Sequence, residues 1–232
     1  MKDFSELEGT LKVTFKNQDI LRQSMVHRSY LNENPGFNLP HNERLEFLGD
    51  AVLELVVTEY LYQHYPNPEG ELTNWRAALV NAVMLSSIAK DLGLEDYLYL
   101  SRGEAKDVGT KARQYILANA IEAVIGAIYL DRGMSAAAEF ISREVLVKLP
   151  GVLESKLYLD PKSRFQELAQ DKAGTTPHYL VLDEHGPDHA KVFRVGLYVG
   201  DELVAEGTGS SKQEAQVAAA EAGLKAKPEW SR

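Results

Sequence analysis

The 232 residues are enough for one large or two modest domains, and a hydrophobic content of 44% can supply real cores. The absence of cysteine excludes disulfide frameworks and thiol chemistry, and no run approaches the ~18 apolar residues of a membrane span. The net charge of −9 argues against a global basic field for nucleic acid, since residues 156–232 carry 10 basic and 12 acidic side chains and the rest 15 and 22. The polar N-terminal stretch lacks the apolar segment of a signal peptide, so a cytoplasmic protein is expected.

The first predicted elements are helices within residues 5–31, followed by a loop over residues 32–41. Asn17 is the predicted cap of a helix that begins near Gln18. The loop is predicted from its proline and glycine content.

The next stretch, HNERLEFLGDAVLELV (residues 41–56), is predicted to be a helix with Asn42 as its N-cap. At about 100° per residue, one side is an ordinary apolar core face. That face consists of Leu45, Leu48, Val52 and Leu55. The acidic residues Glu43, Glu46, Asp50 and Glu54 fall together on the other side, within an arc of roughly 80°.

The acidic arc destabilises the helix by itself. Glu46, Asp50 and Glu54 are like charges at i, i+4, and each such pair costs ~0.2–0.5 kcal/mol. Partial burial among apolar neighbours adds to that cost and raises carboxylate pKa values. A divalent cation would relieve both, and carboxylate oxygens suit Mg²⁺ and Mn²⁺. The alternative is a surface stripe paired with Lys or Arg from elsewhere in the chain.

Residues 71–94 are predicted to form one helix, ended by Gly93. Its expected core residues are Trp75, Leu79, Val83 and Ile88. A polar loop with a cluster of basic residues is predicted over residues 100–114. The functional interpretation is that the cluster contacts phosphate or orients a site carboxylate. The alternative is that the loop is simply exposed to solvent. The cluster consists of Arg102, Lys106, Lys111 and Arg113.

The stretch ILANAIEAVIGAIYL (residues 116–130) is apolar nearly all round and is predicted to be a buried helix. Its only two polar side chains, Asn119 and Glu122, are spaced i, i+3 and therefore share one face. A lone buried Glu is rare unless it is paired or binds metal. We therefore expect this face to pack against the acidic arc, so that Glu46, Asp50, Asn119 and Glu122 hold one cation; a structural hydrogen-bonded pair is the alternative.

The chain then changes character. Ser135 is the predicted cap of a helix over residues 135–149, and the boundary between two domains is predicted near residues 155–160. A short helix opened by Pro161 is followed by three strand candidates and an Ala-rich helix. The strand candidates are HYLVLDE, KVFRVGLYV and ELVAEGTG, the last two joined by a tight turn at Gly200 and Asp201. The predicted order of this second domain is α-β-β-β-α.

The blocks HNERLEFLGDAVLEL and ILANAIEAVIGAIYLD resemble the signature and the second acidic motif of the ribonuclease III family, and the resemblance extends over essentially the whole chain. It implies an all-α endonuclease domain (residues 1–155) whose homodimer, one site per protomer, cuts both strands of double-stranded RNA with Mg²⁺, for which Mn²⁺ substitutes. Glu46, Asp50 and Glu122 match the family's metal-binding and catalytic carboxylates, with Asp50 and Glu122 as the essential pair. Glu43 matches the first acid of the signature, a supporting role.

The C-terminal stretch GTGSSKQEAQVAAAEA resembles the double-stranded-RNA-binding domain, here residues 160–229. Such domains read the A-form shape through two minor grooves and the phosphates between them. The residues that match RNA-contacting positions are Ser163, Gln166, Glu167, His189, Ser211 and Lys212. The sequence departs from the family at Gln213 and Gln216, where further basic residues often stand, which predicts modest RNA affinity.

A second departure is Asn119, which stands where the family usually has Asp. Asn still offers a carbonyl oxygen to a hard cation but no charge, so weaker metal binding is expected. Two functions remain open: an endoribonuclease that processes ribosomal and other precursor RNAs, and a double-stranded-RNA-binding regulator with a weakened or inactive site. The enzyme is favoured because the other acidic positions and both motif contexts are intact.

Overall fold

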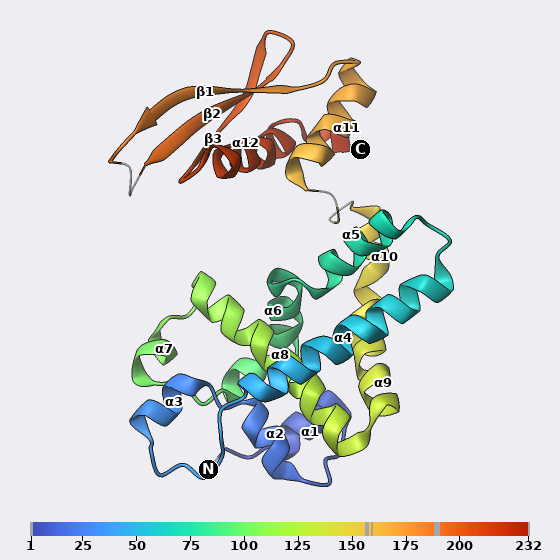
Figure 1. Ribbon diagram of the computed structural model, residues 1–232, viewed down its shortest axis with the longest axis vertical. Coiled ribbons are helices and arrows are strands. Elements are labelled where there is room, and N and C mark those ends of the chain that lie inside the picture. Colours follow the sequence, from blue (N-terminus) through green and yellow to red (C-terminus); the bar gives the residue numbers. More distant parts are fainter. Residues whose placement is uncertain (1, 156–157, 159, 188–190, 232) are drawn as a thin grey trace. The chain divides into compact units, whose positions relative to one another are not determined.

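The computed structural model describes residues 2–155, 158, 160–187 and 191–231 and divides into two compact units, Met1–Tyr158 and Leu159–Arg232 (Figure 1). The regular elements described in the first unit are helices. They are α1 (Ser5–Leu11), α2 (Gln18–Ser24), α3 (Arg28–Glu33), α4 (Glu43–His64), α5 (Glu69–Val80), α6 (Ala82–Asp91), η1 (Leu94–Tyr97), α7 (Arg102–Lys106), α8 (Lys111–Arg132), α9 (Met134–Glu144), η2 (Leu146–Lys148) and α10 (Leu149–Glu154). Among the described residues, no helix is both long and apolar enough to cross a bilayer.

Helices α4 and α8 cross at the centre of this unit (Figure 1). Two glycines face each other's helix at the crossing: a Cβ added at Gly49 would overlap the carbonyl of Glu122, and one at Gly126 would overlap the carbonyl of Leu45. The missing side chains let the two backbones approach closely. As predicted, α8 is buried nearly all round, with Leu117, Ile121, Val124, Ile125 and Ile128 fully buried.

Five local predictions for the helical unit were wrong. Residues 71–94 form two helices, because Asn81 ends α5 and then caps α6, its side chain accepting a hydrogen bond from the Met84 amide at 3.0 Å. Val83 and Leu55 are 68% and 56% exposed rather than core residues. The predicted loop at 100–114 contains α7 and the start of α8.

The fifth concerns the cap of α9. Helix α9 begins at Met134 after Gly133, so Ser135 lies inside it and does not cap it. Asn42 occupies the predicted N-cap position of α4, but its buried amide donates to the Ser24 carbonyl at 3.1 Å. At Asn42 the surrounding packing, not local cap preference, decides how the polar side chain is used.

The second unit has the predicted α-β-β-β-α order. Its elements are α11 (Pro161–Ala173), β1 (His178–His185), β2 (Val192–Val199), β3 (Glu202–Gly209), α12 (Lys212–Ala226) and the short η4 (Pro228–Ser231). The strands form one antiparallel sheet in the order β1-β2-β3, with Gly200 at φ 59° in the turn between β2 and β3.

The two helices of this unit cover one face of the sheet (Figure 1). Val195 and Leu197 of β2 point into that layer and are fully buried, as their alternation predicted. Ala215 and Ala219 of α12 are also fully buried, and a Cβ at Gly207 of β3 would overlap their backbone atoms. Small residues on both sides therefore bring α12 close to the sheet.

Candidate metal centre and nucleic-acid interface

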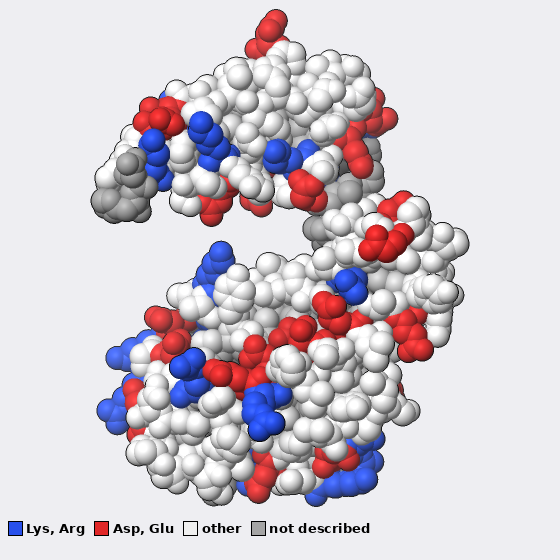
Figure 2. All heavy atoms as spheres, viewed as in Figure 1, with Lys and Arg blue, Asp and Glu red and all other residues white. Residues whose placement is uncertain are grey.

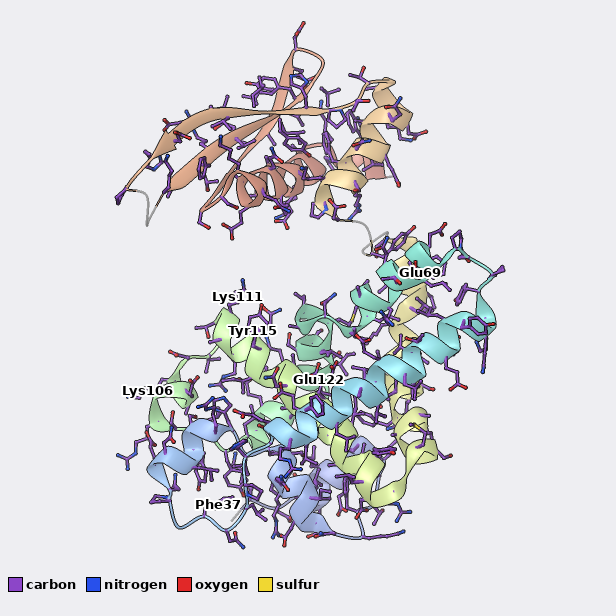
Figure 3. The ribbon with its side chains drawn as sticks, in the orientation of Figure 1. Phe37, Glu69, Lys106, Lys111, Tyr115 and Glu122 are labelled. Carbon is purple, nitrogen blue, oxygen red and sulfur yellow. The ribbon has the colours of Figure 1, made fainter. Side chains whose placement is uncertain are left out.

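The crossing of α4 and α8 positions the predicted site. Glu46 and Asp50 flank Gly49 on α4, and Asn119 and Glu122 lie on the turn of α8 that Gly49 faces. Figure 3 shows Glu122 where α8 passes α4, and Figure 2 shows acidic side chains in a band across this face of the unit. The structure therefore brings the four residues from two distant segments to one place.

Electrostatics confirm that these carboxylates act on one another. Burial, then the charges of Asp50 and Glu46, raises the pKa of Glu122 from an ordinary 4.5 to about 8. The pKa of Glu46 is raised as well, first by burial and then by Glu43, with Asp50 adding to it. Several like charges in a partly buried place disfavour one another's ionised form, which is the condition that a cation would relieve.

Asn119 acts directly on Glu46. A hydrogen bond between the two side chains opposes the rise in the pKa of Glu46, so it favours the ionised carboxylate. Because an ionised carboxylate only accepts hydrogen bonds, the amide nitrogen of Asn119 is the donor. The amide oxygen is not used by that bond, so Asn119 can donate to Glu46 and still present an oxygen.

The chemistry of the donor set fits a hard divalent cation, since carboxylate and amide oxygens are the ligands that Mg²⁺ and Mn²⁺ prefer. In the present side-chain positions, however, the described residues include no group of three or more His, Cys, Asp or Glu that could hold a metal ion. The donors are therefore close enough to raise the pKa values of Glu46 and Glu122 but are not gathered around one coordination centre.

The two ends of the acidic arc are ion-paired, as the surface-stripe alternative required. Glu43 lies 3.6 Å from Arg28 and 3.7 Å from His41, and Glu54 lies 3.6 Å from Arg76. Within the described part of the chain, Glu46, Asp50 and Glu122 have no such partner within 4.0 Å. The surface-stripe interpretation is therefore confirmed at the two ends of the arc, and the metal interpretation of its centre, which faces α8, stays a prediction.

The sequence reasoning missed Arg28 and His41 as partners of Glu43. They come from α3 and from the loop before α4, and only the closeness of His41 to Glu43 in the chain hinted at either. These exposed pairs hold Glu43 at the helix end, where its charge raises the pKa of Glu46.

The basic cluster at 100–114 is divided by the structure. Arg113 is 4% exposed, pairs with Glu95 at 3.1 Å and donates to the Glu104 carbonyl, so it ties α8 to the preceding segments and is not available to phosphate. Lys106 and Lys111 remain exposed, and Figure 3 shows Lys111 at the N-terminal end of α8, the helix that carries Glu122.

Five of the six predicted RNA-contacting residues of the second unit are described, and these five are exposed on α11 or at the start of α12. Gln166 and Glu167 lie on the exposed side of α11, where the Ser163 hydroxyl donates to the capping carboxylate of Asp160. Ser211 caps α12 by accepting from the Glu214 amide at 3.1 Å, and Lys212 follows it. His189 lies outside the described residues.

The ammonium of Lys212 is 5.8 Å from the ring centre of Phe193, as is that of Lys191. The two lysines come from α12 and from the start of β2 and converge on one aromatic ring beside the helix N-terminus. In Figure 2, basic side chains that this view shows of the second unit lie along the side on which Figure 1 places α12.

Two family models match the chain: "Ribonuclease-III-like" over residues 17–149 and "Double-stranded RNA binding motif" over residues 161–227. The chain is 42% identical over 225 residues to "Ribonuclease 3" of Dehalococcoides mccartyi, covering 97% of this chain and 94% of that protein. It is 45% identical over 224 residues to "Ribonuclease 3" of Chloroflexus aggregans, covering 95% and 96%.

Among solved structures, the helical unit is similar to the nuclease domain of ribonuclease III from Campylobacter jejuni, with a TM-score of 0.57 and 39% identity over 64% of this chain and 99% of that one. That protein is described as structurally flexible in a region involved in dimer formation.

Proposed function

Because the chain belongs to the ribonuclease III family and is an endoribonuclease that acts on double-stranded RNA, we propose that the phosphodiester bond is hydrolysed at the α4–α8 crossing with the help of a divalent cation. The observation that carries this proposal is the meeting of Glu46, Asp50 and Glu122 at the crossing without a basic partner, where burial and the neighbouring acids raise the pKa values of Glu46 and Glu122. When bound there, the cation supplies an activated water and polarises the scissile phosphate.

Four residues would hold the cation: Glu46, Asp50, Asn119 and Glu122. Mg²⁺ fits this oxygen set, and Mn²⁺ substitutes for it because both accept hard oxygen ligands. Asp50, which is exposed, and Glu122, which is half-buried, form the essential pair. At neutral pH the raised pKa keeps the carboxyl of Glu122 largely protonated, so this residue must give up a proton to become a ligand.

Glu43 has a supporting role. Arg28 and His41 hold it beside Glu46, where it adds negative charge without being gathered into the donor set. Asn119 holds the carboxylate of Glu46 by its amide N–H, and its amide oxygen would be one of the ligands of a bound cation.

The second unit binds the RNA duplex. We assign this contact to the exposed surface of α11 and the N-terminal end of α12, whose free N–H groups suit phosphate. The residues involved are Ser163, Gln166, Glu167, His189, Ser211 and Lys212. Their number is small, so RNA affinity should fall with salt according to the few phosphates contacted.

A homodimer through the helical unit is supported by exposed apolar side chains on α4. Phe47, Leu55 and Tyr62 are 81%, 56% and 79% exposed, and their spacing of eight and seven residues puts them on one side of the helix. An apolar stripe of this kind is typical of a protein–protein interface. Two protomers joined there would supply two sites, one for each RNA strand.

We place the substrates among structured precursor RNAs in the cytoplasm, with ribosomal precursors as the main class. The decisive experiment is cleavage of a long RNA duplex in Mg²⁺ and in Mn²⁺ by the unaltered protein and by Glu122→Gln. Cleavage that disappears in Glu122→Gln, while duplex binding persists, supports the proposed site. Duplex binding with no cleavage in either metal would instead identify a binding regulator.

A further inference from the structure

The RNA-binding unit has few cations where it needs them. Its sequence carries 10 basic and 12 acidic side chains over residues 156–232, and on the first turns of α12 only Lys212 is basic, because positions 213 and 216 are both glutamine. Phosphate contacts supply most of the affinity of a protein for a duplex. The unit should therefore present cations from other elements.

Lys162, on the first turn of α11, reaches α12. Its ammonium donates to the side-chain oxygen of Gln216 at 2.7 Å and lies 5.2 Å from the ring centre of Tyr179. Burial raises the pKa of Tyr179 to about 12, so the ring that faces the ammonium is neutral. The two contacts hold a flexible lysine in one place, which reduces the entropy lost when it binds a ligand.

That place is on the predicted RNA surface. Lys212 and Gln216 are spaced i, i+4, so they share one face of α12 and their Cβ atoms are about 5–6 Å apart. Lys162 also immediately precedes Ser163, which matches an RNA-contacting position. The ammonium of Lys162 thus lies at the spot where the side chain of Gln216 ends, one turn along α12 from Lys212, whose own ammonium lies against Phe193.

Among the described residues, no carboxylate forms an ion pair within 4.0 Å of this ammonium, although Asp160 attracts it from a longer distance. The carboxylate of Asp160 accepts from the amides of Lys162 and Ser163 and from the Ser163 hydroxyl, as the cap of α11. The carboxylate of Glu214 accepts from the amide and hydroxyl of Ser210. An ammonium has three donors, and Gln216 takes one of them.

We propose that Lys162 binds a phosphate of the RNA duplex and that the side chain of Gln216 positions the Lys162 ammonium. Helix α11 then supplies the positive charge that α12 lacks because residue 216 is glutamine. The inference rests on the proposed RNA surface at the N-terminal end of α12. It predicts that the two helices bind one stretch of RNA backbone jointly, through Lys162 and Lys212.

The test measures the affinity of the whole chain for an RNA duplex of about 20 base pairs. Binding is measured by fluorescence anisotropy in EDTA, which removes divalent cations and so prevents cleavage. In Lys162→Met, the slope of log K against log salt should decrease by about 0.9, which corresponds to roughly fivefold weaker binding at about 0.15 M salt. The matched control is Lys172→Met on the last turn of α11, where the lysine pairs with Asp171 at 3.2 Å. It removes the same charge and should leave the slope unchanged.

A double variant separates phosphate binding from packing between α11 and α12. Lys162→Met with Gln216→Lys moves the cation from one helix to the other at the same place, so it should restore the slope even if Lys162→Met alone lowers the melting temperature. A wild-type slope in Lys162→Met, or a slope that the double variant does not restore, would overturn the proposal. Lys212→Met is the reference: if its slope is also that of wild type, the proposed RNA surface fails, not Lys162 alone.

Discussion

Replacing Glu122 by Gln should stabilise the metal-free protein, although it removes one of the two residues to which we assign catalysis. Gln has nearly the same shape but cannot ionise. In the folded chain, burial and the charges of Asp50 and Glu46 raise the pKa of Glu122 from 4.5 to about 8. Between these pH values the unfolded chain loses the proton and the folded chain keeps it, so this group lowers stability progressively as pH rises from 4.5 through 8.

The interval from 4.5 to about 8 corresponds to at most about 5 kcal/mol, at about 1.4 kcal/mol for each pH unit. The carboxyl is only partly buried, so solvent screening reduces the effect, and we take roughly half of it. The expected gain for Glu122→Gln is then about 2 kcal/mol near pH 8.5 and under about 1 kcal/mol near pH 5.5. A gain of about 2 kcal/mol raises the melting temperature of a unit of this size by roughly 4–8 °C.

The assay is thermal unfolding followed by circular dichroism in EDTA at both pH values, with Glu139→Gln on the exposed side of α9 as the control for loss of one acid. Added Mn²⁺ should reverse the order, because a bound cation stabilises the protein with four intact donors more than the variant. A Glu122→Gln protein no more stable than wild type near pH 8.5, or a gain equal at both pH values, would refute the reasoning.

Three further predictions follow from the same crossing and from the α4 surface. Asn119→Asp should lower metal-free stability by about 1 kcal/mol, because a like charge replaces the donor to Glu46, and should tighten Mn²⁺ binding in calorimetric titration. Gly126→Ala should destabilise by about 3 kcal/mol in urea unfolding, since its Cβ would overlap the Leu45 carbonyl. Phe47→Asp should shift sedimentation toward the monomer with the helical fold intact by circular dichroism, because Phe47 is 81% exposed on the proposed interface.

Local periodicity was enough to predict most of the elements. The 3.6-residue pattern around Leu45 and the apolar run around Glu122 gave helices α4 and α8, and the alternation at Val195 and Leu197 gave β2. These predictions succeed because the burial of each residue follows from the side of its own helix or strand on which it lies. The two acidic motifs are also long and specific, which is why the family resemblance is visible in the amino-acid sequence alone.

Local pattern failed where a neighbouring element decides burial. Leu55 has the correct phase for the core of α4, yet no element of the described chain covers it. Arg113 is a residue type that often contacts phosphate. In the structure, however, it is buried, and its guanidinium pairs with Glu95 and donates to the Glu104 carbonyl. At Asn81, the side chain caps a new helix where the apolar spacing continues unbroken.

The sequence by itself determined which acids the chain carries, on which helices and at what spacing, because helical geometry converts spacing into faces. Only the tertiary structure decided which of those acids pair with basic residues and which face the acid on the other helix. The arc on α4 is uniform in sequence, but Glu43 and Glu54 find basic partners at its ends, whereas Glu46 and Asp50 meet Glu122 at the point where Gly49 and Gly126 let two backbones touch. Charges that are alike in sequence become different because desolvation and distance, which set their pKa values, depend on the helix packed against them.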